Sequence, residues 1–579
     1  MLPKQHTSRR AQAWPRLSRR ARTLGLGAAL CGISSCVPAV VGASSGSSSS
    51  SSSPNKLQVV AWSPTPGETG VDPAATVSVT FDETVVPTSY SSDQLIATGP
   101  GGPVAGTLQG SGATLTFTAD DPWYLAAPHD VRVTGGVEGD EGGKLIGDAL
   151  SGFTTRDVVL SSGGSFADAA DASAVHLAAV QANPYRVQAL VERAPVGSDR
   201  ELSIYGLLAG TGGWQSIGSI VTSPTLATYD IDVSLAGYGV IGYEDNGEIW
   251  ASRLSPDDFV WTPPQRIDVG SETLGGTVRV AASDAGHAYV LWESNVDQTP
   301  YAAAFDPAVG NWGAPFKLNY PGAGLSVDAV VVADVAGRAL VAWAQAPDDG
   351  SKPPDGIWSR RYIPGAGWEV QPRMLHGSTL TVVSNLTLSA SLDEPEALLA
   401  WQEDDTLPEL HRIYAARWRF SPNQLSGLEQ VDTPQFEAET SYEPLVQATS
   451  GSDGIVLWRA RETQIPVTDT LWFALRQGGS WGPPQELDGV ELGASADPDV
   501  VRDLAGNVSI CWTQAKEQGS STRSVWLRRL VAGALQSATE VGGAEELPFL
   551  QRPNLAVLPN GGVALLWFEA SEPDYQTFQ

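Results

Sequence analysis

A short pattern recurs eight times between residues 165 and 579, and it constrains the fold more than any other feature of the chain. The clearest copy is SDAGHAYVLW at residues 283–292, in which an apolar run ends in a tryptophan. Successive copies lie 49 to 58 residues apart. Their anchor residues are Val191, Tyr243, Trp292, Trp343, Trp401, Trp458, Trp512 and Trp567. Regular copies of one unit predict a repeat architecture, in which neighbouring units bury each other's apolar faces.

Each unit of about fifty residues has room for four short strands. The chain contains 61 Gly and 40 Pro and only 17% charged residues, a composition typical of many short strands joined by turns. Four-stranded sheets repeated around an axis form a β-propeller, and this unit length suits one blade. We expect eight blades; seven blades with a degenerate first unit, or an open solenoid of sheets, are the alternatives. The last unit lacks a fourth strand, so we expect residues 156–162 to supply it and close the ring.

The strand that carries each anchor is expected to be buried on both faces. In residues 288–292 the side chains alternate between two faces, and both faces are apolar. Such a strand lies between two neighbouring layers, so we predict that the anchors pack at the interfaces between blades. A glycine precedes five of the anchors by six residues, at a turn that needs a positive φ. These glycines are Gly237, Gly286, Gly337, Gly506 and Gly561.

His287 has no counterpart in the other copies, where Arg338 or Asn507 takes its place, and we interpret it as a surface residue. The chain has six His and contains no HExxH, paired-cysteine, GxSxG or phosphate-binding glycine motif. We therefore predict no metal site, no cofactor and no nucleophilic serine. The one alternative is Ca²⁺ held by carboxylate oxygens. The acidic residues that could serve are Asp348, Asp349, Asp404 and Asp405.

The first 35 residues indicate export. They contain seven Lys or Arg and no acidic residue, and the apolar run at residues 24–33 is too short to span a bilayer, which is typical of a signal peptide. The run ends in ISSC at residues 33–36, which resembles the lipobox of bacterial lipoproteins. The resemblance implies a lipid on Cys36. Cleavage near residues 41–43 and export through the twin-arginine route, suggested by Arg19 and Arg20, are the alternatives.

Removal of this leader leaves a strongly acidic chain. Lys and Arg fall from 35 to 28 against 65 Asp and Glu, so the formal charge becomes −37. Such a chain is repelled by nucleic acid and by anionic lipid surfaces, which leaves the lipid as the membrane contact. Residues 36–55, with an unbroken serine run at 47–53, are expected to form a flexible linker. Beyond the leader only Cys511 remains, and we expect it buried on a strand.

Residues 56–156 carry a different pattern. Runs such as TVSVTF, ATLTFTA and DVRVTG alternate apolar and polar residues, as the strands of a β-sandwich do. Together with WSPTPGETGVDP and the closing GFTT, these runs resemble the bacterial Ig-like domain of S-layer and other surface proteins. The resemblance implies a spacer. His129 departs from the family pattern, and we expect it to be a hydrogen-bonded residue at a sheet edge. Residues 157–579 are assigned to the propeller.

The residues that follow the anchors are candidates for a binding face, because polar and variable loops come directly after them. They are Glu192, Glu244, Glu293, Gln402 and Arg459. We expect a lipid-anchored protein of the bacterial cell envelope, at the outer membrane or cell surface, whose propeller binds a glycan, peptide or protein. We assign no catalytic residue. A propeller glycosidase, sialidase-like enzyme or lyase and a purely structural surface protein are the alternatives. A sialidase Asp-box would place its aromatic residue three positions after the glycine, and here the separation is six.

Overall fold

A computed structural model of the chain gives the fold. It describes residues 56–159, 164–165, 172–179, 185–193, 199–208, 214–256, 260–269, 277–294, 296–319, 324–346, 356–377, 381–391, 394–405, 411–432, 440–449, 453–461, 469–488, 493–517, 520, 522–542, 553–569 and 572–578. The expected signal peptide, Cys36 and the serine-rich linker lie outside these ranges. Over the described residues, no helix is long and apolar enough to cross a membrane.

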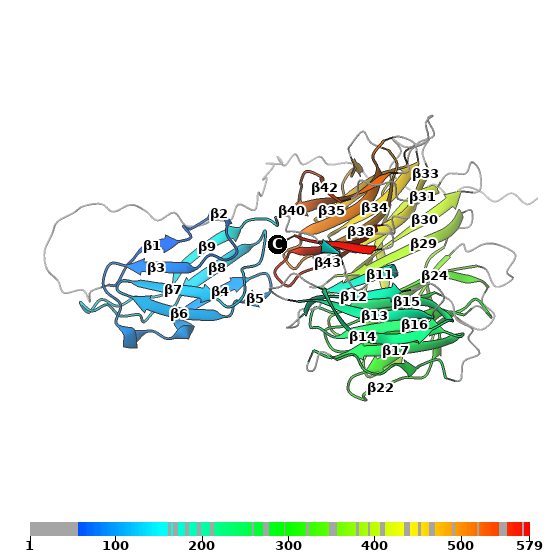
Figure 1. Ribbon diagram of the computed structural model, residues 1–579, viewed down its shortest axis with the longest axis horizontal. Helices are drawn as coiled ribbons and strands as arrows, with labels where there is room; N and C mark the ends of the chain where they lie inside the picture. The colour runs from blue at the N-terminus through cyan, green and yellow to red at the C-terminus, as the bar shows by residue number, and fades with distance from the viewer. Residues whose placement is uncertain are drawn as a thin grey trace, which may run out of the picture. The chain divides into compact units, whose positions relative to one another are not determined.

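The first domain is a two-sheet β-sandwich. One sheet has the order β1-β3-β7-β6 and the other β2-β9-β8-β4-β5, with β2 and β9 parallel and the remaining pairs antiparallel (Figure 1). Their bounds are β1 Val59–Ser63, β2 Glu68–Val71, β3 Val77–Phe81, β4 Leu95–Gly99, β5 Gly102–Pro103, β6 Gly106–Ser111, β7 Thr114–Ala119, β8 Pro128–Val133 and β9 Ala149–Thr155, with single-turn 3-10 helices at Pro87–Ser89 and Ser92–Gln94. The alternation in the sequence directs every second side chain of β3 into the core.

We expected His129 at a sheet edge, and this prediction was wrong. It is on β8, which is paired on both sides by β9 and β4, and only 1% of its surface is exposed. Its ring packs against those of Trp123 and Phe153, which also contact each other, and its Nε2 is 2.9 Å from the carbonyl oxygen of Tyr124. The imidazole is a core side chain with one polar partner, and burial lowers its pKa.

The rest of the described chain forms antiparallel sheets, one for each sequence repeat, and eight such sheets are present in the described residues. The first three comprise β11 Ala172–Ala179, β12 Tyr185–Arg193, β13 Arg200–Leu208 and β14 Trp214–Ser223; β15 Leu226–Val233, β16 Gly239–Asp245, β17 Glu248–Leu254 and β18 Gln265–Arg266; and β19 Val278–Ala282, β20 Ala288–Glu293, β21 Pro300–Asp306, β22 Asn311–Trp312 and β23 Phe316–Lys317. The next two comprise β24 Ser326–Ala333, β25 Ala339–Gln345, β26 Gly356–Ile363, β27 Gly367–Trp368 and β28 Arg373–Gly377; and β29 Thr381–Ala390, β30 Glu396–Asp405, β31 His411–Arg419 and β32 Gln424–Gln430.

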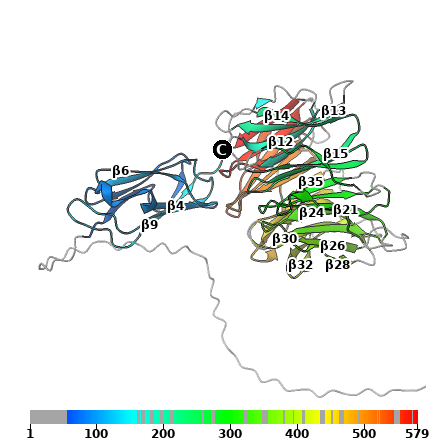
Figure 2. The same ribbon diagram turned by 90° about the horizontal axis from the view of Figure 1, so that it is seen from below.

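The remaining sheets complete the ring. They comprise β33 Thr440–Ala448, β34 Gly454–Arg461, β35 Asp469–Gln477, β36 Ser480–Trp481 and β37 Gln485–Glu486; β38 Ser495–Arg502, β39 Val508–Ala515, β40 Arg523–Val531, β41 Ala534–Leu535 and β42 Thr539–Gly542; and β43 Asn554–Val557, β44 Val563–Glu569 and β45 Glu572–Phe578 with β10 Gly164–Ser165. The inner strands β11, β15, β19, β24, β29, β33, β38 and β43 contact one another in this order, and β43 contacts β11. The sheets therefore close around a central axis, which is the propeller arrangement (Figures 1 and 2).

The ring is closed by a strand from the other end of the domain, as predicted, but the position of that strand was predicted wrongly. Gly164 and Ser165 pair with β45, whereas residues 157–159 of the predicted segment are not in a strand and residues 160–162 lie outside the described residues. Arg156 still belongs to the sandwich, where its backbone nitrogen bonds the carbonyl oxygen of Val71. The side chain of Val158 packs on the apolar core between the last two sheets. Arg156 and Val158 therefore have other partners, and the pairing with β45 is made by residues further along the chain.

The aromatic anchors lie at the interfaces between sheets. Trp292, Trp343, Trp401, Trp458 and Trp512 are at most 1% exposed. Trp401 on β30 packs against Leu340 and Ile357 of the preceding sheet. Each of the other four tryptophans likewise packs with apolar residues of the sheet that precedes its own. The central strands are buried on both faces because each has a sheet on either side. Cys511 on β39 is fully buried, which confirms its predicted place in the core.

The turns before the anchor strands confirm the predicted role of glycine. Gly237, Gly286, Gly337, Gly506 and Gly561 have φ values between 79° and 86°. In the third sheet the nitrogen of Gly286 bonds the oxygen of Ser283, and the nitrogen of Ser283 bonds the oxygen of His287. A positive φ at the glycine lets this tight connection form without a steric clash.

His287 is buried rather than at the surface, so our sequence interpretation of this residue was wrong. Its side chain packs against Gly337 in the corresponding turn of the next sheet, where a Cβ would lie 2.3 Å from Nδ1. The ring of Tyr362 lies beside it, and Asp306 Oδ1 is 3.8 Å from Nε2. A single repeat cannot reveal this contact, because the adjacent repeat covers the histidine.

Candidate functional site

Four consecutive inner strands share a local distortion near the start of each strand. β24, β29, β33 and β38 each contain a bulge, where the pairing with the next strand shifts register. A residue with a left-handed backbone lies in each bulge, and the four φ values are 53° or 54°. These residues are Asp328, Asn385, Glu443 and Asp497. Non-glycine residues in this conformation are strained, and such strain is often concentrated at functional sites.

The four residues could have been found in the sequence. Each lies 15 or 16 residues before a tryptophan anchor, and all four are polar. We missed them because the inner strands show little similarity to one another beyond this position. Asp and Asn are the side chains that best tolerate a left-handed backbone, and they occupy three of the four sites.

Polar residues at this end of the ring form a continuous chain of hydrogen bonds, some within one sheet and some between neighbouring sheets. The backbone nitrogen of Asn385 donates to Asp328 Oδ2 at 2.7 Å, and its side-chain Nδ2 donates to Gln402 Oε1 at 2.9 Å. Glu443 N also donates to Gln402 Oε1, at 3.3 Å. Arg459 Nη1 then donates to Glu443 Oε2 at 2.8 Å. We call Asp328, Asn385, Gln402, Glu443 and Arg459 the loop-end network.

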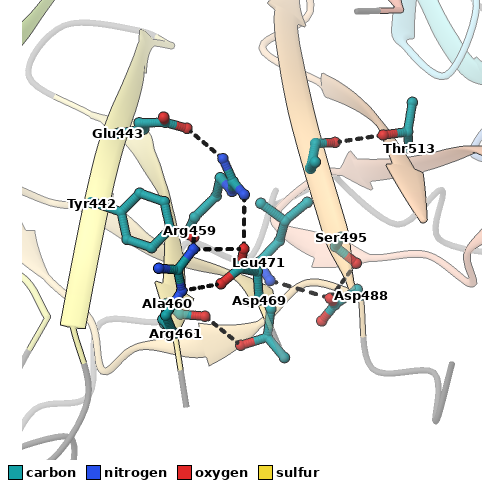
Figure 3. A network of polar contacts seen from close by, with 12 residues as sticks. Tyr442, Glu443, Arg459, Ala460, Arg461, Asp469, Leu471, Asp488, Ser495 and Thr513 are labelled. Atoms are coloured by element: carbon teal, nitrogen blue, oxygen red, sulfur yellow. Dashed lines mark hydrogen bonds and ion pairs between the residues drawn. The ribbon is translucent and has the colours of Figure 1, made fainter. Parts of the chain in front are cut away.

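Arg459 also connects this network to a second cluster on the same sheet (Figure 3). Its guanidinium lies 4.8 Å from the ring centre of Tyr442, and that of Arg461 lies 5.4 Å from the same ring. Asp469 Oδ2 accepts from Arg459 Nη2 at 2.9 Å, and Asp469 Oδ1 accepts from Arg461 Nε at 2.9 Å. Burial alone would lower the pKa of Arg459, but Glu443, Tyr442 and Asp469 together raise it. The guanidinium is therefore fixed in place and stays charged.

The structure brings three of the five predicted binding residues to this region. Gln402 and Arg459 are members of the loop-end network, and Glu293 Oε1 accepts from the nitrogen of Ala329, next to Asp328, at 2.8 Å. Burial raises the pKa of the Glu293 carboxyl, and the nearby Asp328 adds to the rise.

The other two predicted residues have partners of their own. Glu192 is 4% exposed, pairs with Arg200 at 2.5 Å and accepts from the hydroxyl of Tyr229 at 2.9 Å. Glu244 is half-buried and accepts from the backbone of Gly247; burial raises the pKa of its carboxyl. These contacts belong to sheets β11–β14 and β15–β18.

Two carboxylates of β30, which follow Gln402 in the sequence, pair with histidines of other strands. His376 Nε2 is 2.7 Å from Glu403 Oε1, and Glu403 also accepts from Trp401 Nε1 at 2.9 Å. These hydrogen bonds lower the pKa of Glu403 against the opposing effect of burial. His411 pairs with Asp404. Glu403 thus connects an aromatic anchor of the core to the polar end of the ring.

The alternative Ca²⁺ site receives no further support. Asp348 and Asp349 lie outside the described residues, and Asp404 is bonded by His411 and by Gln402 Nε2. Within the described ranges, no group of three or more His, Cys, Asp or Glu side chains is placed to hold a metal ion.

Comparisons with known proteins bear mainly on the first domain. Residues 53–155 match the sequence family of bacterial Ig-like domains. The predicted Ig-like domain is therefore confirmed, and such a domain is typical of an extracellular or surface protein. No curated protein sequence matches the chain.

Similar solved structures include a lectin, a propeller and a polysaccharide lyase. The BP39L lectin from Burkholderia pseudomallei is 12% identical with a TM-score of 0.40, and the match covers 64% of this chain and 100% of the lectin. The Dos1 propeller is 8% identical with a TM-score of 0.41, covering 72% and 95%. A PL25 ulvan lyase bound to -[GlcA(1-4)Rha3S]- is 8% identical with a TM-score of 0.39, covering 58% and 89%. At these levels the likeness concerns the fold alone, and the ring of sheets described above carries the description of this chain as a propeller.

Proposed function

We propose that this protein is a lipid-anchored bacterial envelope protein whose propeller binds a glycan at the loop-end network. The observation that carries the proposal is the chain of hydrogen bonds from Asp328 through Asn385, Gln402 and Glu443 to Arg459, two of which cross between sheets. These five side chains come from three adjacent sheets, and the fold fixes their positions before any ligand arrives. A site that is fixed in advance loses less entropy on binding.

The chemistry of the network suits a ligand rich in hydroxyl groups. Each sugar hydroxyl both donates and accepts, and amide, carboxylate and guanidinium groups offer several donor and acceptor positions on one side chain. Asn385 and Glu443 are exposed, so a ligand can reach them. The mixed charge of Asp328, Glu443 and Arg459 favours a neutral or mixed-charge sugar over a strongly charged one.

A peptide or protein ligand is the alternative within the binding class. Such a partner would use the loops that follow the anchors, and large parts of these loops, at residues 347–355, 406–410 and 462–468, lie outside the described residues. The glycan proposal rests on the described network and does not need them.

A glycosidase or lyase is a second candidate function, and one observation favours it. Glu293 has a raised pKa beside the carboxylate of Asp328, and a buried acid next to a second carboxylate is the usual arrangement for general acid catalysis. Against this, Glu293 bonds the nitrogen of Ala329 and Asp328 bonds the nitrogen of Asn385, so both carboxylates have structural partners. We therefore place binding first.

A glycan array followed by calorimetry on the full chain tests the proposal. We expect at least one array ligand whose affinity falls about tenfold or more in Asn385→Ala, because one well-placed hydrogen bond is worth about 1.4 kcal/mol. Gln424→Ala, an exposed residue on the outer strand β32 of the same sheet, is the matched control and should change nothing. Equal losses in both variants, or an array without any hit, would count against glycan binding. Turnover of a sugar substrate that disappears in Glu293→Gln would favour the enzyme.

The anchor requires a separate experiment. Cells grown with radioactive palmitate should label the wild-type protein, and Cys36→Ala should abolish the label while Cys31→Ala keeps it. Labelling that persists in Cys36→Ala would refute a lipid on this residue.

A further inference from the structure

The inner strands enclose a cavity of about 450 Å³ at the other end of the ring. Its wall comes from all eight inner strands, always from residues near their ends or just beyond them. In β24, for example, the wall is formed by residues 331–335, whereas the left-handed Asp328 lies near the start of the same strand. The cavity and the loop-end network are therefore two separate places along the central axis.

The size of the cavity is that of a site for a small molecule. Ligand pockets in proteins usually measure about 300–1,000 Å³ and combine an apolar wall with a few polar groups that fix orientation. Here the apolar part of the wall includes Val280, Val332, Leu388 and Leu555.

The polar part of the wall consists of serines, one glutamine and four charged residues, and three of these four are acidic. Two of the acidic residues lie on neighbouring sheets. Asp232 at the end of β15 and Asp284 in the turn after β19 both face the cavity. Asp232 Oδ2 accepts from the nitrogen of Ala282 at 2.8 Å, and Asp284 Oδ1 accepts from the nitrogen of Ala236 at 2.8 Å. These bonds hold the two carboxylates in place and leave them further acceptor positions, because a carboxylate has about four.

The other two charged residues of the wall are Asp334 and Arg502, and neither neutralises Asp232 and Asp284. Asp334 is buried and pairs with Arg338 at 2.5 Å, so its charge is already compensated. Arg502 contributes one positive charge, but it comes from β38, which lies across the ring from β19 in the order of the sheets. The side of the cavity at Asp232 and Asp284 therefore remains negative.

Burial raises the pKa of Asp232 to about 6, and its neighbours Asp230 and Asp284 add to this rise. A carboxylate is costly where it is desolvated beside like charges, and a bound cation removes part of that cost. A bare metal ion fits poorly, because Ca²⁺ and Mg²⁺ need six or more oxygen ligands and most of the wall is apolar.

We propose that this cavity binds a small organic amine, with its ammonium group at Asp232 and Asp284 and its hydrocarbon part against the valines and leucines of the wall. The inference is independent of the glycan proposal, since no residue is shared between the two sites.

Calorimetry on the full chain with 2-phenylethylamine tests the proposal, and 2-phenylethanol serves as the uncharged probe of matched shape. We expect the amine to bind and the alcohol to bind at least about tenfold more weakly. Asp232→Asn should weaken amine binding about tenfold or more, because it removes the charge while its amide oxygen can still accept from Ala282. Ala390→Phe, which fills the cavity from β29 without removing a polar group, should abolish binding of both probes. Asp93→Asn, in the Ig-like domain, is the control.

Three results would overturn the inference. They are no binding of the amine to the wild type up to about 10 mM, equal affinity for amine and alcohol, and unchanged amine affinity in Asp232→Asn. Asn385→Ala should leave amine binding intact, so a failure of the glycan proposal and a failure of this one can be told apart. If Ala390→Phe does not fold, as judged by circular dichroism, the comparison of Asp232→Asn with the wild type still decides.

Discussion

The carboxylate of Asp232 accepts a hydrogen bond from the backbone nitrogen of Ala282 across the gap between two neighbouring sheets, at 2.8 Å. Asp499 has the same relation to the nitrogen of Leu555, at 2.7 Å. Each inner strand is an edge strand of its own sheet, so part of its backbone lacks a strand partner. Side chains from the adjacent inner strand supply the missing acceptors. Neighbouring sheets are thus joined by polar contacts at their inner strands and by the aromatic anchors at the second strand of each sheet.

This relationship predicts the effect of removing one acceptor. Asp499→Ala should lower the free energy of unfolding by about 1–3 kcal/mol, because the nitrogen of Leu555 loses its acceptor in a partly buried place. Asp499→Asn should cost less, since an amide oxygen can accept the same bond. Urea unfolding followed by tryptophan fluorescence measures both, with the exposed Glu429→Ala as control. Equal losses for the Ala and Asn variants would contradict the assigned role of the oxygen.

The buried carboxyl of Asp432 should make the free energy of unfolding depend on pH. It is fully buried, and burial raises the pKa of its carboxyl from 3.8 to about 6. The folded state therefore holds the proton more tightly than the unfolded state. The stability contributed by this group is fully present below about pH 4 and is lost as the pH rises through 6. A shift of this size corresponds to on the order of 3 kcal/mol.

The comparison with Asp432→Asn isolates this contribution, because the amide keeps the shape of the side chain and does not titrate. Relative to the variant, the wild type should lose stability between pH 4 and pH 7. Urea titrations of both proteins at the two pH values provide the measurement. A stability difference that stays constant across this range would show that Asp432 does not titrate with a raised pKa.

Much of the fold could be predicted from the sequence because it follows from local patterns. The spacing of Trp292, Trp343 and the later anchors gives the repeat, and the alternation in residues 56–156 gives the sandwich. The positive φ of Gly286 follows from its place beside Asp284 in a turn. These features depend on interactions within one repeat or on its regular recurrence.

Apart from the left-handed residues, whose spacing before the anchors does recur, the features that were missed depend on contacts between repeats. His287 is covered by the turn that contains Gly337, and Gln402 joins Asn385 to Glu443 on the next sheet. The cavity at Asp232 is formed by eight strands that are far apart in the sequence. No periodicity within the chain encodes such contacts, because they are set by how neighbouring sheets pack.

Trp343 provides a test of the packing at the interfaces. It is fully buried between two sheets, and its Nε1 donates to Gln345 Oε1 at 2.8 Å. Trp343→Ala should lower the free energy of unfolding by about 3–5 kcal/mol, since it leaves a large cavity and an unpaired amide. Val370→Ala, in the same repeat and 83% exposed, should change it by less than about 0.5 kcal/mol. A small effect of Trp343→Ala would mean that the interface can collapse to fill the space.

Alanine substitutions at Gly337 and Gly506 distinguish the cost of backbone strain at the turn from the cost of a steric clash. Both have φ of 82° and occupy the same position in their repeats. A Cβ at Gly506 would meet nothing within 4 Å, whereas one at Gly337 would lie 2.3 Å from His287 Nδ1. Gly506→Ala should therefore cost only the left-handed backbone strain of about 1–2 kcal/mol, and Gly337→Ala should cost about 1–3 kcal/mol more from overpacking.

The double variant Gly337→Ala with His287→Ala identifies the clashing partner. Removing the imidazole makes room for the added methyl group, so the double variant should be more stable than the sum of the two single changes predicts. Thermal or urea unfolding of the four proteins gives the coupling energy. Simple additivity would show that His287 does not limit the space at Gly337, and equal losses in Gly337→Ala and Gly506→Ala would show that backbone strain alone sets the cost.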